Sequence, residues 1–402
     1  MSCLKTEREL LSSHLPIHKH YMKVAITADA HLREERSERL SALEEVFKGT
    51  HASNIEHLII AGDLFDENPE LALVNQFKEL VEKFPALKVH VILGNHDPGL
   101  SSGSFALDNL RIYSQPGPAS IVAKDTFMMM PYLEGSSMGD ELAGLPLPSN
   151  GNDWILIGHG DYMSGNWKPN PLESKHGTSV YMPLQRGDLE FYKPKRVFLG
   201  HIHKPTPVQS PLDGWVLYPG SPHGLDVTET GRRRFLIYDD EANEVEEHWI
   251  NTGKIFYNET FLMVPADEEL ATLEQAMAAT ISGWGLTDEE MQRVSLRANF
   301  GGFCQSTLMR VQEAVGSICE RVKGPGRVDI KTEKLRPEFH DPRRRKLAEK
   351  VIQKIELLAA QGPSAGEGAH DDPLESWWEF GDREPSMGEV KQAALDIIYL
   401  NK

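Results

Sequence analysis

Five short motifs in this 402-residue chain place aspartate, asparagine and histidine side chains directly after apolar runs. They are Asp29-x-His31, Gly62-Asp63-x-x-Asp66, Gly94-Asn95-His96-Asp97, Gly158-His159 and Gly200-His201-x-His203. Carboxylate, amide and imidazole groups together hold divalent cations such as Mn²⁺, Fe²⁺ or Zn²⁺, and the mixture of oxygen and nitrogen donors favours Mn²⁺. Because no cysteine stands among them, a purely structural zinc site is disfavoured. The motifs predict a site where two divalent cations share a carboxylate and activate water toward a phosphoryl group.

Each motif by itself has an ordinary structural explanation. Asp63 after a glycine fits a helix N-cap, and Asp29-x-His31 fits a turn. A single buried residue such as His159 is more often a hydrogen-bonded core histidine than a ligand. By contrast, His201 and His203 follow a buried run at positions i and i+2, for which packing offers no reason. Repetition of one design at five successive strand ends therefore favours a common site.

The elements that must position these residues alternate between strands and helices. Apolar runs at 23–29, 57–63 and 89–93 predict strands, and the spacing over 37–49 and 71–84 predicts helices between them. This β-α-β-α-β order predicts a mostly parallel sheet whose carboxyl strand ends share one edge. Further strands are predicted at 154–158 and 196–200, and we expect 216–221 and 234–238 to complete a second sheet packed on the first. The predicted fold class is α/β, a two-sheet sandwich flanked by helices.

Beyond the two sheets, the pattern predicts a capping domain and a tail. We expect residues 22–255 to form the main domain, after an N-terminal extension at 1–21. Residues 256–335 predict a small α+β domain, with strands at 259–264, 293–299 and 328–332 and helices at 268–281 and 305–322. Residues 336–402 predict a tail with an acidic linker at 361–389 between two helices. Helix 343–360 would carry a stripe of Leu347, Val351, Ile355 and Leu358, and helix 386–400 one of Val390, Ala394, Ile397 and Ile398.

Composition sets broader limits on the kind of protein. No apolar run approaches the roughly 18 residues of a membrane span, and the first 21 residues lack a secretory signal. Three cysteines cannot form a disulfide framework, so we expect a reducing cytoplasm. The net charge of −18 argues against indiscriminate nucleic-acid binding without excluding a nuclease. Basic residues near the last motif would either contact DNA phosphates or form a solvated face; they are Lys193, Lys195, Arg196, Lys204 and Arg232 to Arg234.

Over about residues 22–250 the five ordered motifs resemble those of the calcineurin-like metallophosphoesterases. The resemblance implies that Asp29, His31 and His203 hold one metal ion. It implies that Asn95, His159 and His201 hold the other, with Asp63 bridging both. His96 would lie over the substrate phosphate as transition-state stabiliser or general acid, with Asp66 orienting it.

The whole layout resembles the Mre11/SbcD nucleases, in which a phosphoesterase core precedes a capping domain and a helical tail. This resemblance implies a DNA exo/endonuclease in DNA repair or foreign-DNA processing, and a homodimer. It also implies a Rad50/SbcC-like SMC-family ATPase as partner, bound through helices 343–360 and 386–400. Two alternatives remain open from the sequence: a stand-alone phosphoesterase acting on nucleotides or other small phosphoesters, and a non-catalytic scaffold. The chain departs from the family pattern at Arg33, where a glycine is common.

Overall fold

The computed structural model describes residues 23–66, 69–97, 100, 105, 107–121, 126–147, 153–164, 180–321, 324–338, 341–360 and 387–400. The predicted N-terminal extension, and the linker as far as residue 386, lie outside the described residues.

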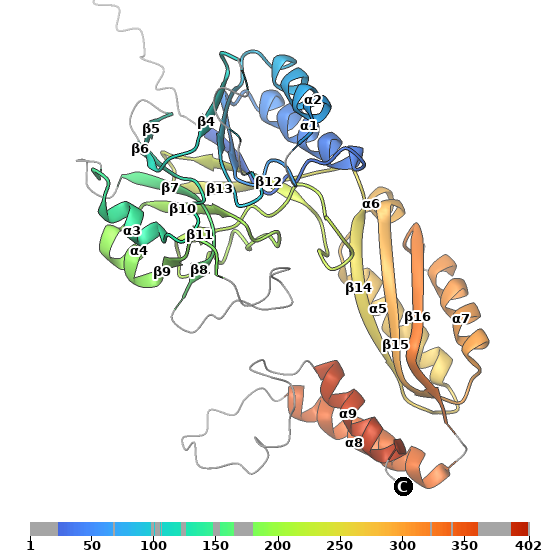
Figure 1. Cartoon of the computed structure of the whole chain (residues 1–402). Coiled ribbons are helices and arrows are strands. Elements are labelled where there is room, and N and C mark those ends of the chain that lie inside the picture. Colours follow the sequence, from blue (N-terminus) through green and yellow to red (C-terminus); the bar gives the residue numbers. More distant parts are fainter. Residues whose placement is uncertain are drawn as a thin grey trace, which may run out of the picture.

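A six-stranded sheet carries the first three motifs, with the strand order β13-β12-β1-β2-β3-β4. Its parallel strands are β1 (Lys23–Thr27), β2 (His57–Ala61), β3 (Lys88–Ile92) and β4 (Leu110–Tyr113). Helix α1 (Ser37–Ala52) joins β1 to β2, and helix α2 (Leu71–Glu82) joins β2 to β3 (Figure 1). Parallel neighbours need such crossover helices, so the predicted β-α-β-α-β order is confirmed.

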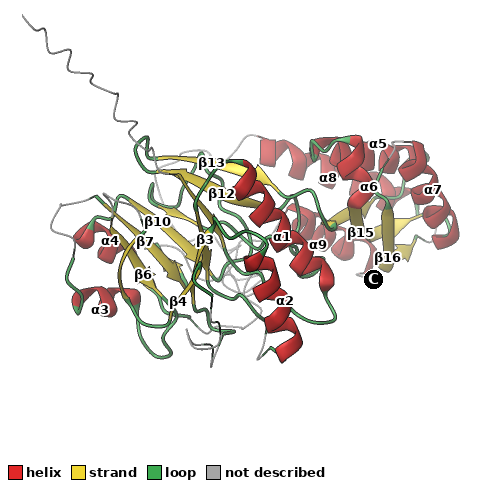
Figure 2. Cartoon of the chain, turned by 90° about the horizontal axis from the view of Figure 1, so that it is seen from above, coloured by secondary structure: helices red, strands yellow, loops and turns green. Residues whose placement is uncertain are grey.

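A five-stranded sheet, with the order β11-β10-β7-β6-β5, carries the last two motifs. Its strands are β5 (Gly117–Ser120), β6 (Thr126–Met130), β7 (Trp154–His159), β10 (Arg196–Gly200) and β11 (Val216–Leu217). Helices α3 (Met138–Ala143) and α4 (Arg186–Tyr192) cover its outer face, as α1 and α2 cover the outer face of the first sheet (Figure 2). The short strands β8 (Tyr162–Met163) and β9 (Leu184–Gln185) pair beside it.

The two sheets pack face to face through one apolar layer. Ile26 and Ile59 from the first sheet meet Phe127, Ile157 and Phe198 from the second, and all five are fully buried. Because these strands are covered on both faces, they appear in the sequence as continuous apolar runs. The predicted α/β two-sheet sandwich is therefore confirmed.

One strand lies in a different sheet from the one expected. The strand predicted at 234–238 is β12 (Arg234–Asp239), which pairs antiparallel with β1 in the first sheet, and β13 (Glu244–Trp249) extends that edge. The prediction that it completes the second sheet was wrong; of the two strands, only β11 does so. An apolar run buried on both faces does not show which free edge it pairs with.

The capping domain lies beside the sandwich and is built from β-α-β crossovers (Figure 1). Its strands β14 (Ile255–Met263), β15 (Val294–Cys304) and β16 (Arg327–Pro337) are parallel to one another. Helices α5 (Glu269–Gly283) and α7 (Leu308–Arg321) connect them, and the short α6 (Asp288–Arg293) precedes β15. Phe261 and Met263 of β14 face the cluster that includes α5 and α7, whereas Leu262 and Val264 face the other way.

The tail helices α8 (Pro342–Ala360) and α9 (Met387–Leu400) pack together against that second face of the capping sheet (Figure 1). The buried contacts come from Phe303, Ala348, Ile352 and Leu395.

The predicted stripe on the first tail helix was only partly right. Ile355 packs inward, but Leu347 and Leu358 are 51% and 54% exposed. Apolar residues occupy more than one face of α8, so the sequence does not show which face meets the capping sheet. None of the described helices is both long and apolar enough to cross a membrane.

Candidate metal centre

The five motifs meet at one edge of the sandwich, where β1, β2, β3, β7 and β10 end. Ligand atoms of Asp29, His31 and His203 lie within 4.8 Å of one another, and so do those of Asp63, His159 and His201. A third such group, His31, Asp63 and His96, overlaps both. Asn95 Oδ1 lies 2.9 Å from His159 Nε2 and 3.1 Å from His201 Nδ1. The structure thus brings all the sequence-predicted ligands together.

The backbone at this edge adopts conformations that most side chains avoid. Asp29, His31, Asp63 and His201 have φ angles of 55°, 43°, 49° and 95°, in the left-handed region. Each such residue costs on the order of 1–3 kcal/mol and persists only where surrounding contacts hold it. Here Asp29 N donates to Gly62 O at 3.0 Å, and His31 N donates to Asp63 O at 2.9 Å. Because these four strained residues are all candidate ligands, we infer that the turns are built to position ligand side chains rather than to give the backbone its most stable local conformation.

The glycines in the motifs are explained by the close approach of neighbouring loops. A Cβ at Gly62 would lie 2.1 Å from His159 Nδ1, and one at Gly200 would lie 1.9 Å from the carbonyl oxygen of Ala61. A Cβ at Gly94 would lie 2.1 Å from Asp63 Oδ1. The Gly-Asp, Gly-Asn and Gly-His pairs therefore serve packing between the strand ends as well as turn formation.

Three of the four histidines among the candidate ligands have an Nδ1 acceptor that is not itself a candidate ligand. His31 Nδ1 donates to Asp66 Oδ1 at 3.1 Å, and His203 Nδ1 donates to Glu229 Oε1 at 2.8 Å. His159 Nδ1 donates to a backbone carbonyl, that of Ala61, at 2.9 Å. An acceptor at Nδ1 fixes the tautomer and leaves the lone pair at Nε2, which is the usual arrangement for a metal-ligating histidine.

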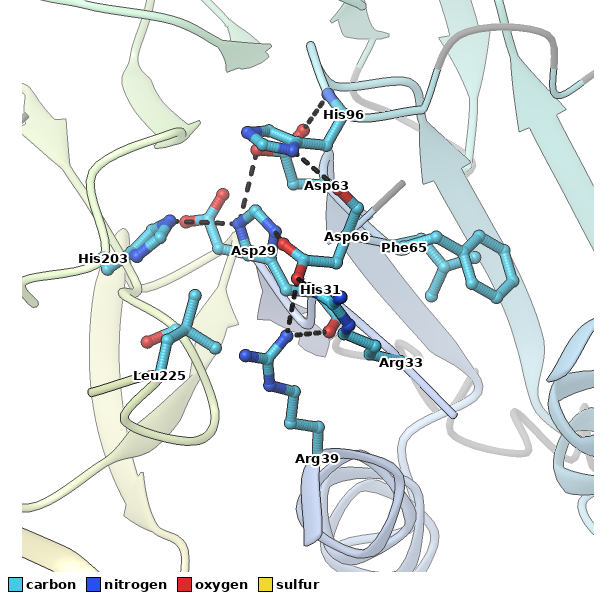
Figure 3. Close-up of polar contacts among 12 residues, drawn as sticks. Asp29, His31, Arg33, Arg39, Asp63, Phe65, Asp66, His96, His203 and Leu225 are labelled. Atoms are coloured by element: carbon cyan, nitrogen blue, oxygen red, sulfur yellow. Dashed lines mark hydrogen bonds and ion pairs between the residues drawn. The ribbon is translucent and has the colours of Figure 1, made fainter. Parts of the chain in front are cut away.

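Two histidine nitrogens point at each other at close range. The Nε2 atoms of His31 and His203 lie 3.0 Å apart (Figure 3), and in the neutral tautomers that the Nδ1 acceptors favour, their lone pairs would face each other. In addition, Asp29 Oδ2 is buried with no hydrogen-bond partner among the described residues, while Oδ1 accepts from His201 N at 2.8 Å. A buried polar atom without a partner is costly and is rare in folded proteins. The donor set therefore fits divalent cations, which would pair with each of these atoms.

Electrostatics point the same way. Burial raises the pKa of Asp29 to about 6 and lowers the pKa of His31 to about 4. Burial alone would lower the pKa of His159, but Asp63 and Asp29 raise it to about 9. Burial alone would likewise raise the pKa of Asp63, but His159 and His31 hold it well below its usual range. Positive charge beside the two buried carboxylates thus stabilises them, and either protonated His159 or a bound cation would supply it.

The acid predicted to orient His96 does so in a different way. Figure 3 shows Asp66 between His31 and two arginines, and its carboxylate contacts Arg39 Nη1 and Arg33 Nη1, each at 3.2 Å. His96 Nδ1 instead donates to the backbone carbonyl of Asp66 at 2.8 Å. The hydrogen bond from His31 holds the pKa of the Asp66 carboxyl well below its usual range. The Asp66 side chain therefore acts on His31, and only its backbone acts on His96.

Several residues around the site were not predicted from the sequence. Asp97, the last residue of its motif, accepts from the backbone nitrogens of Gly94, Leu64 and Phe65 at 3.0–3.1 Å, so it ties two ligand loops together. Glu229, Arg39 and Tyr181 also adjoin the site. Their signal in the sequence is weak, because none of the three belongs to a motif and each stands in an otherwise ordinary segment.

The basic residues expected near DNA phosphates are largely engaged within the fold. Lys195 Nζ donates to Asp240 Oδ1 at 2.9 Å. Arg233 and Arg234 are only 5% and 2% exposed, and Arg232 is bound by a glutamate of the capping domain. The hypothesis that Arg233 and Arg234 contact DNA was therefore wrong, since a charge run does not reveal which of its members are buried.

Comparison with known proteins places the site within a known domain type. Residues 22–205 match the model of the calcineurin-like phosphoesterase family, and this range includes every predicted ligand. A search of curated proteins found no significant match. Among solved structures, the protein TT1561 of Thermus thermophilus is similar, with 10% sequence identity and a TM-score of 0.36, over 57% of this chain and 99% of that chain.

Proposed function

Because residues 22–205 form a calcineurin-like phosphoesterase domain, we propose that this protein is a nuclease that hydrolyses DNA phosphodiester bonds with two divalent cations, Mn²⁺ being favoured. The observation that carries the proposal is the pair of imidazole nitrogens of His31 and His203, held 3.0 Å apart beside an Asp29 oxygen that has no hydrogen-bond partner among the described residues. The family implies a metal-dependent phosphoester hydrolase. DNA as the substrate is the finer part of the proposal.

Each side chain has a defined task in this mechanism. Asp29, His31 and His203 would hold one cation, Asn95, His159 and His201 the other, and Asp63 would serve both. Cations in such a site polarise a phosphoryl oxygen and lower the pKa of water, so that hydroxide is available near neutral pH. His96 has its Nδ1 engaged by the Asp66 carbonyl, so its contact with a phosphate oxygen or leaving group would be made through Nε2.

Aromatic side chains beside the ligands support a nucleic-acid substrate. The Tyr181 ring lies 4.8 Å from the His201 ring, and the Tyr132 ring lies 6.1 Å from Tyr181. Both tyrosines are half-buried. Nucleobases stack on such rings with a gain of about 1–3 kcal/mol per base. Two rings at the edge of a phosphoesterase site therefore suit a substrate with bases flanking the scissile phosphate.

The tail supports the proposed partner, a Rad50/SbcC-like SMC-family ATPase, and so a role in DNA repair or foreign-DNA processing. With α8 and α9 packed on the capping sheet, apolar side chains on both helices still face solvent, among them Leu347, Leu358 and Ile397. Exposed apolar groups of this size on a helical pair suit a helical partner. We also propose that the chain forms a homodimer, which light scattering of the purified protein would test.

A second candidate function, hydrolysis of nucleotides or other small phosphoesters by the chain alone, is favoured by one observation. Arg233 and Arg234 are buried, so they are not available to a long DNA backbone. Binding of a DNA duplex gains affinity from each phosphate that a basic side chain contacts, because each contact releases counterions. A small phosphoester has few phosphates and therefore needs few such contacts.

Cleavage of end-labelled duplex and single-stranded DNA by the purified chain in Mn²⁺ distinguishes the two candidates. We expect cleavage that is lost in His96→Ala. Tyr181→Leu should reduce DNA cleavage roughly 5- to 150-fold, the equivalent of one lost stacking contact, while hydrolysis of bis-p-nitrophenyl phosphate is retained. The nuclease proposal would be refuted if the chain left DNA intact, both by itself and with a matching ATPase, while it hydrolysed nucleotides rapidly.

The partner surface has a separate test. Ile397→Asp together with Leu347→Asp should abolish ATPase binding without affecting hydrolysis of bis-p-nitrophenyl phosphate. Ile398 is unsuitable for this purpose because it packs against the buried cluster under the tail. Met309→Asp is the matched control, since Met309 is an exposed apolar residue on α7 of the capping domain. Equal binding by all these variants would contradict the proposed interface.

A further inference from the structure

The loop between β11 and β12 surrounds the metal-ligand candidate His203. Glu229, in this loop, accepts from His203 Nδ1 through Oε1 at 2.8 Å. Its Oε2 accepts from Leu225 N at 2.8 Å and from Ser221 Oγ at 3.3 Å. The Glu229 side chain is 10% exposed. A buried carboxylate with both oxygens engaged is fixed in place, and so is the imidazole that it holds.

The same loop also holds the backbone of His203. Arg233 Nη1 donates to His203 O at 2.7 Å, and Ser221 N donates to the same oxygen at 3.1 Å. Arg233 in turn forms an ion pair with Glu229 at 3.7 Å. The ring and the carbonyl of His203 are therefore both positioned by residues 221–233, whereas its own strand, β10, ends at Gly200.

The outer side of the loop is attached to the capping domain. Arg232 donates from Nε to Glu290 Oε1 at 2.7 Å and from Nη2 to Glu290 Oε2 at 2.6 Å, and Nη2 also donates to Gly285 O at 2.8 Å. Beside it, Gly231 N donates to Phe256 O at 2.9 Å. Two adjacent arginines thus contact different parts of the protein: Arg233 binds His203, and Arg232 binds the capping domain.

We propose that Glu229 is a positioning residue for His203, and that loop 221–233 couples the capping domain to the affinity of the cation position formed by Asp29, His31 and His203. The inference rests on the proposed binding of divalent cations but not on DNA as the substrate. The carboxylate at Nδ1 directs the Nε2 lone pair toward the cation and raises its basicity. A movement of the capping domain, such as a partner on the tail would produce, reaches Glu229 through Arg232 and Arg233.

Titration of the metal-free full chain with Mn²⁺, by calorimetry and by the electron paramagnetic resonance of free Mn²⁺, tests the role of Glu229. We expect two bound ions in the wild type. In Glu229→Ala one of the two should bind about 10–100-fold more weakly, with the other unchanged. Glu229→Gln keeps an acceptor for Nδ1 and should recover part of the loss. Glu241→Ala, an exposed glutamate in the turn between β12 and β13, should behave as wild type.

Arg232→Met tests the coupling, with Arg321→Met as the control because it removes an ion pair, Arg321 to Glu274, that lies within the capping domain. Arg232→Met should weaken the same ion as Glu229→Ala, and the double variant should lose less than the product of the two single losses, because both act through one loop. Wild-type affinity in Glu229→Ala would overturn the positioning role. Wild-type affinity in Arg232→Met would overturn the coupling. A wild-type chain that binds no Mn²⁺ would refute the proposed metal function itself, and this inference with it.

Discussion

Replacing Gly94 by alanine tests how far the metal centre depends on the close approach of two ligand loops. A Cβ at this position would lie 2.1 Å from Asp63 Oδ1 and 2.3 Å from the Asp63 backbone nitrogen, whereas ordinary contacts begin at 3.4 Å. Rotation of the Asp63 side chain cannot relieve the second contact, so the loops must separate by about 1 Å. Misplacement of that size in a catalytic site costs about 10²-fold in rate.

We therefore expect kcat/KM of Gly94→Ala for bis-p-nitrophenyl phosphate to fall about 10²-fold, with weaker Mn²⁺ binding in calorimetric titration. The matched control is Gly316→Ala in α7, where a Cβ would meet nothing within 4 Å. It should leave activity unchanged and raise stability by about 1 kcal/mol, because alanine favours a helix more than glycine does. Thermal melting separates a local effect from unfolding. Wild-type kcat/KM and Mn²⁺ affinity in a folded Gly94→Ala protein would refute the reasoning.

Three further predictions concern other parts of the molecule. Asp66→Ala removes the acceptor at His31 Nδ1 and should weaken Mn²⁺ binding about 10–100-fold in calorimetry; unchanged affinity would show that the carboxylate does not orient His31. Burial and His57 lower the pKa of His90 to about 3. An unfolded histidine takes up its proton near pH 6.5, whereas folded His90 does so only near pH 3, so the free energy of unfolding should fall by at most about 4 kcal/mol between these two pH values. In His90→Gln this loss should be smaller, which an acid titration followed by circular dichroism would measure. Leu395→Ala opens a cavity in the cluster under the tail and should destabilise α8 and α9 by about 2–5 kcal/mol, visible as faster amide exchange there. Hydrolysis of bis-p-nitrophenyl phosphate should be unaffected, and its loss would mean that the tail supports the metal centre directly.

The residues that converge at the metal centre could be predicted from the sequence because each follows a buried strand. His201 and His203 stand at i and i+2 after one such strand, and Asp63 and Asn95 follow two neighbouring parallel strands. Parallel strands bring their carboxyl ends to one edge, so the order of motifs along the chain is enough to bring these side chains near one another. Only the alternation of apolar runs and helices was needed for this prediction.

The supporting contacts could not be predicted in the same way. Glu229 is one acid among many in a polar loop, and nothing near it in the sequence marks it as the partner of His203. Arg233 and Arg234 are adjacent to Arg232 in a run of positive charge, yet the first two are buried and the third binds the capping domain. Contacts of this kind join residues far apart in the chain, so they depend on how the loops are folded over the strand ends.

The sequence by itself determined the two-sheet architecture, the helices between the strands and the set of candidate ligands, because apolar periodicity and the polar residues that follow it are local properties. Only the tertiary structure decided that β12 pairs with β1, that α8 turns Ala348 and Ile352 toward the capping sheet, and that Asp66 acts on His31 through its side chain. Each of these outcomes depends on which of several similar surfaces come into contact. The competing apolar or charged faces of one chain have similar local sequence patterns, so the sequence alone does not distinguish them.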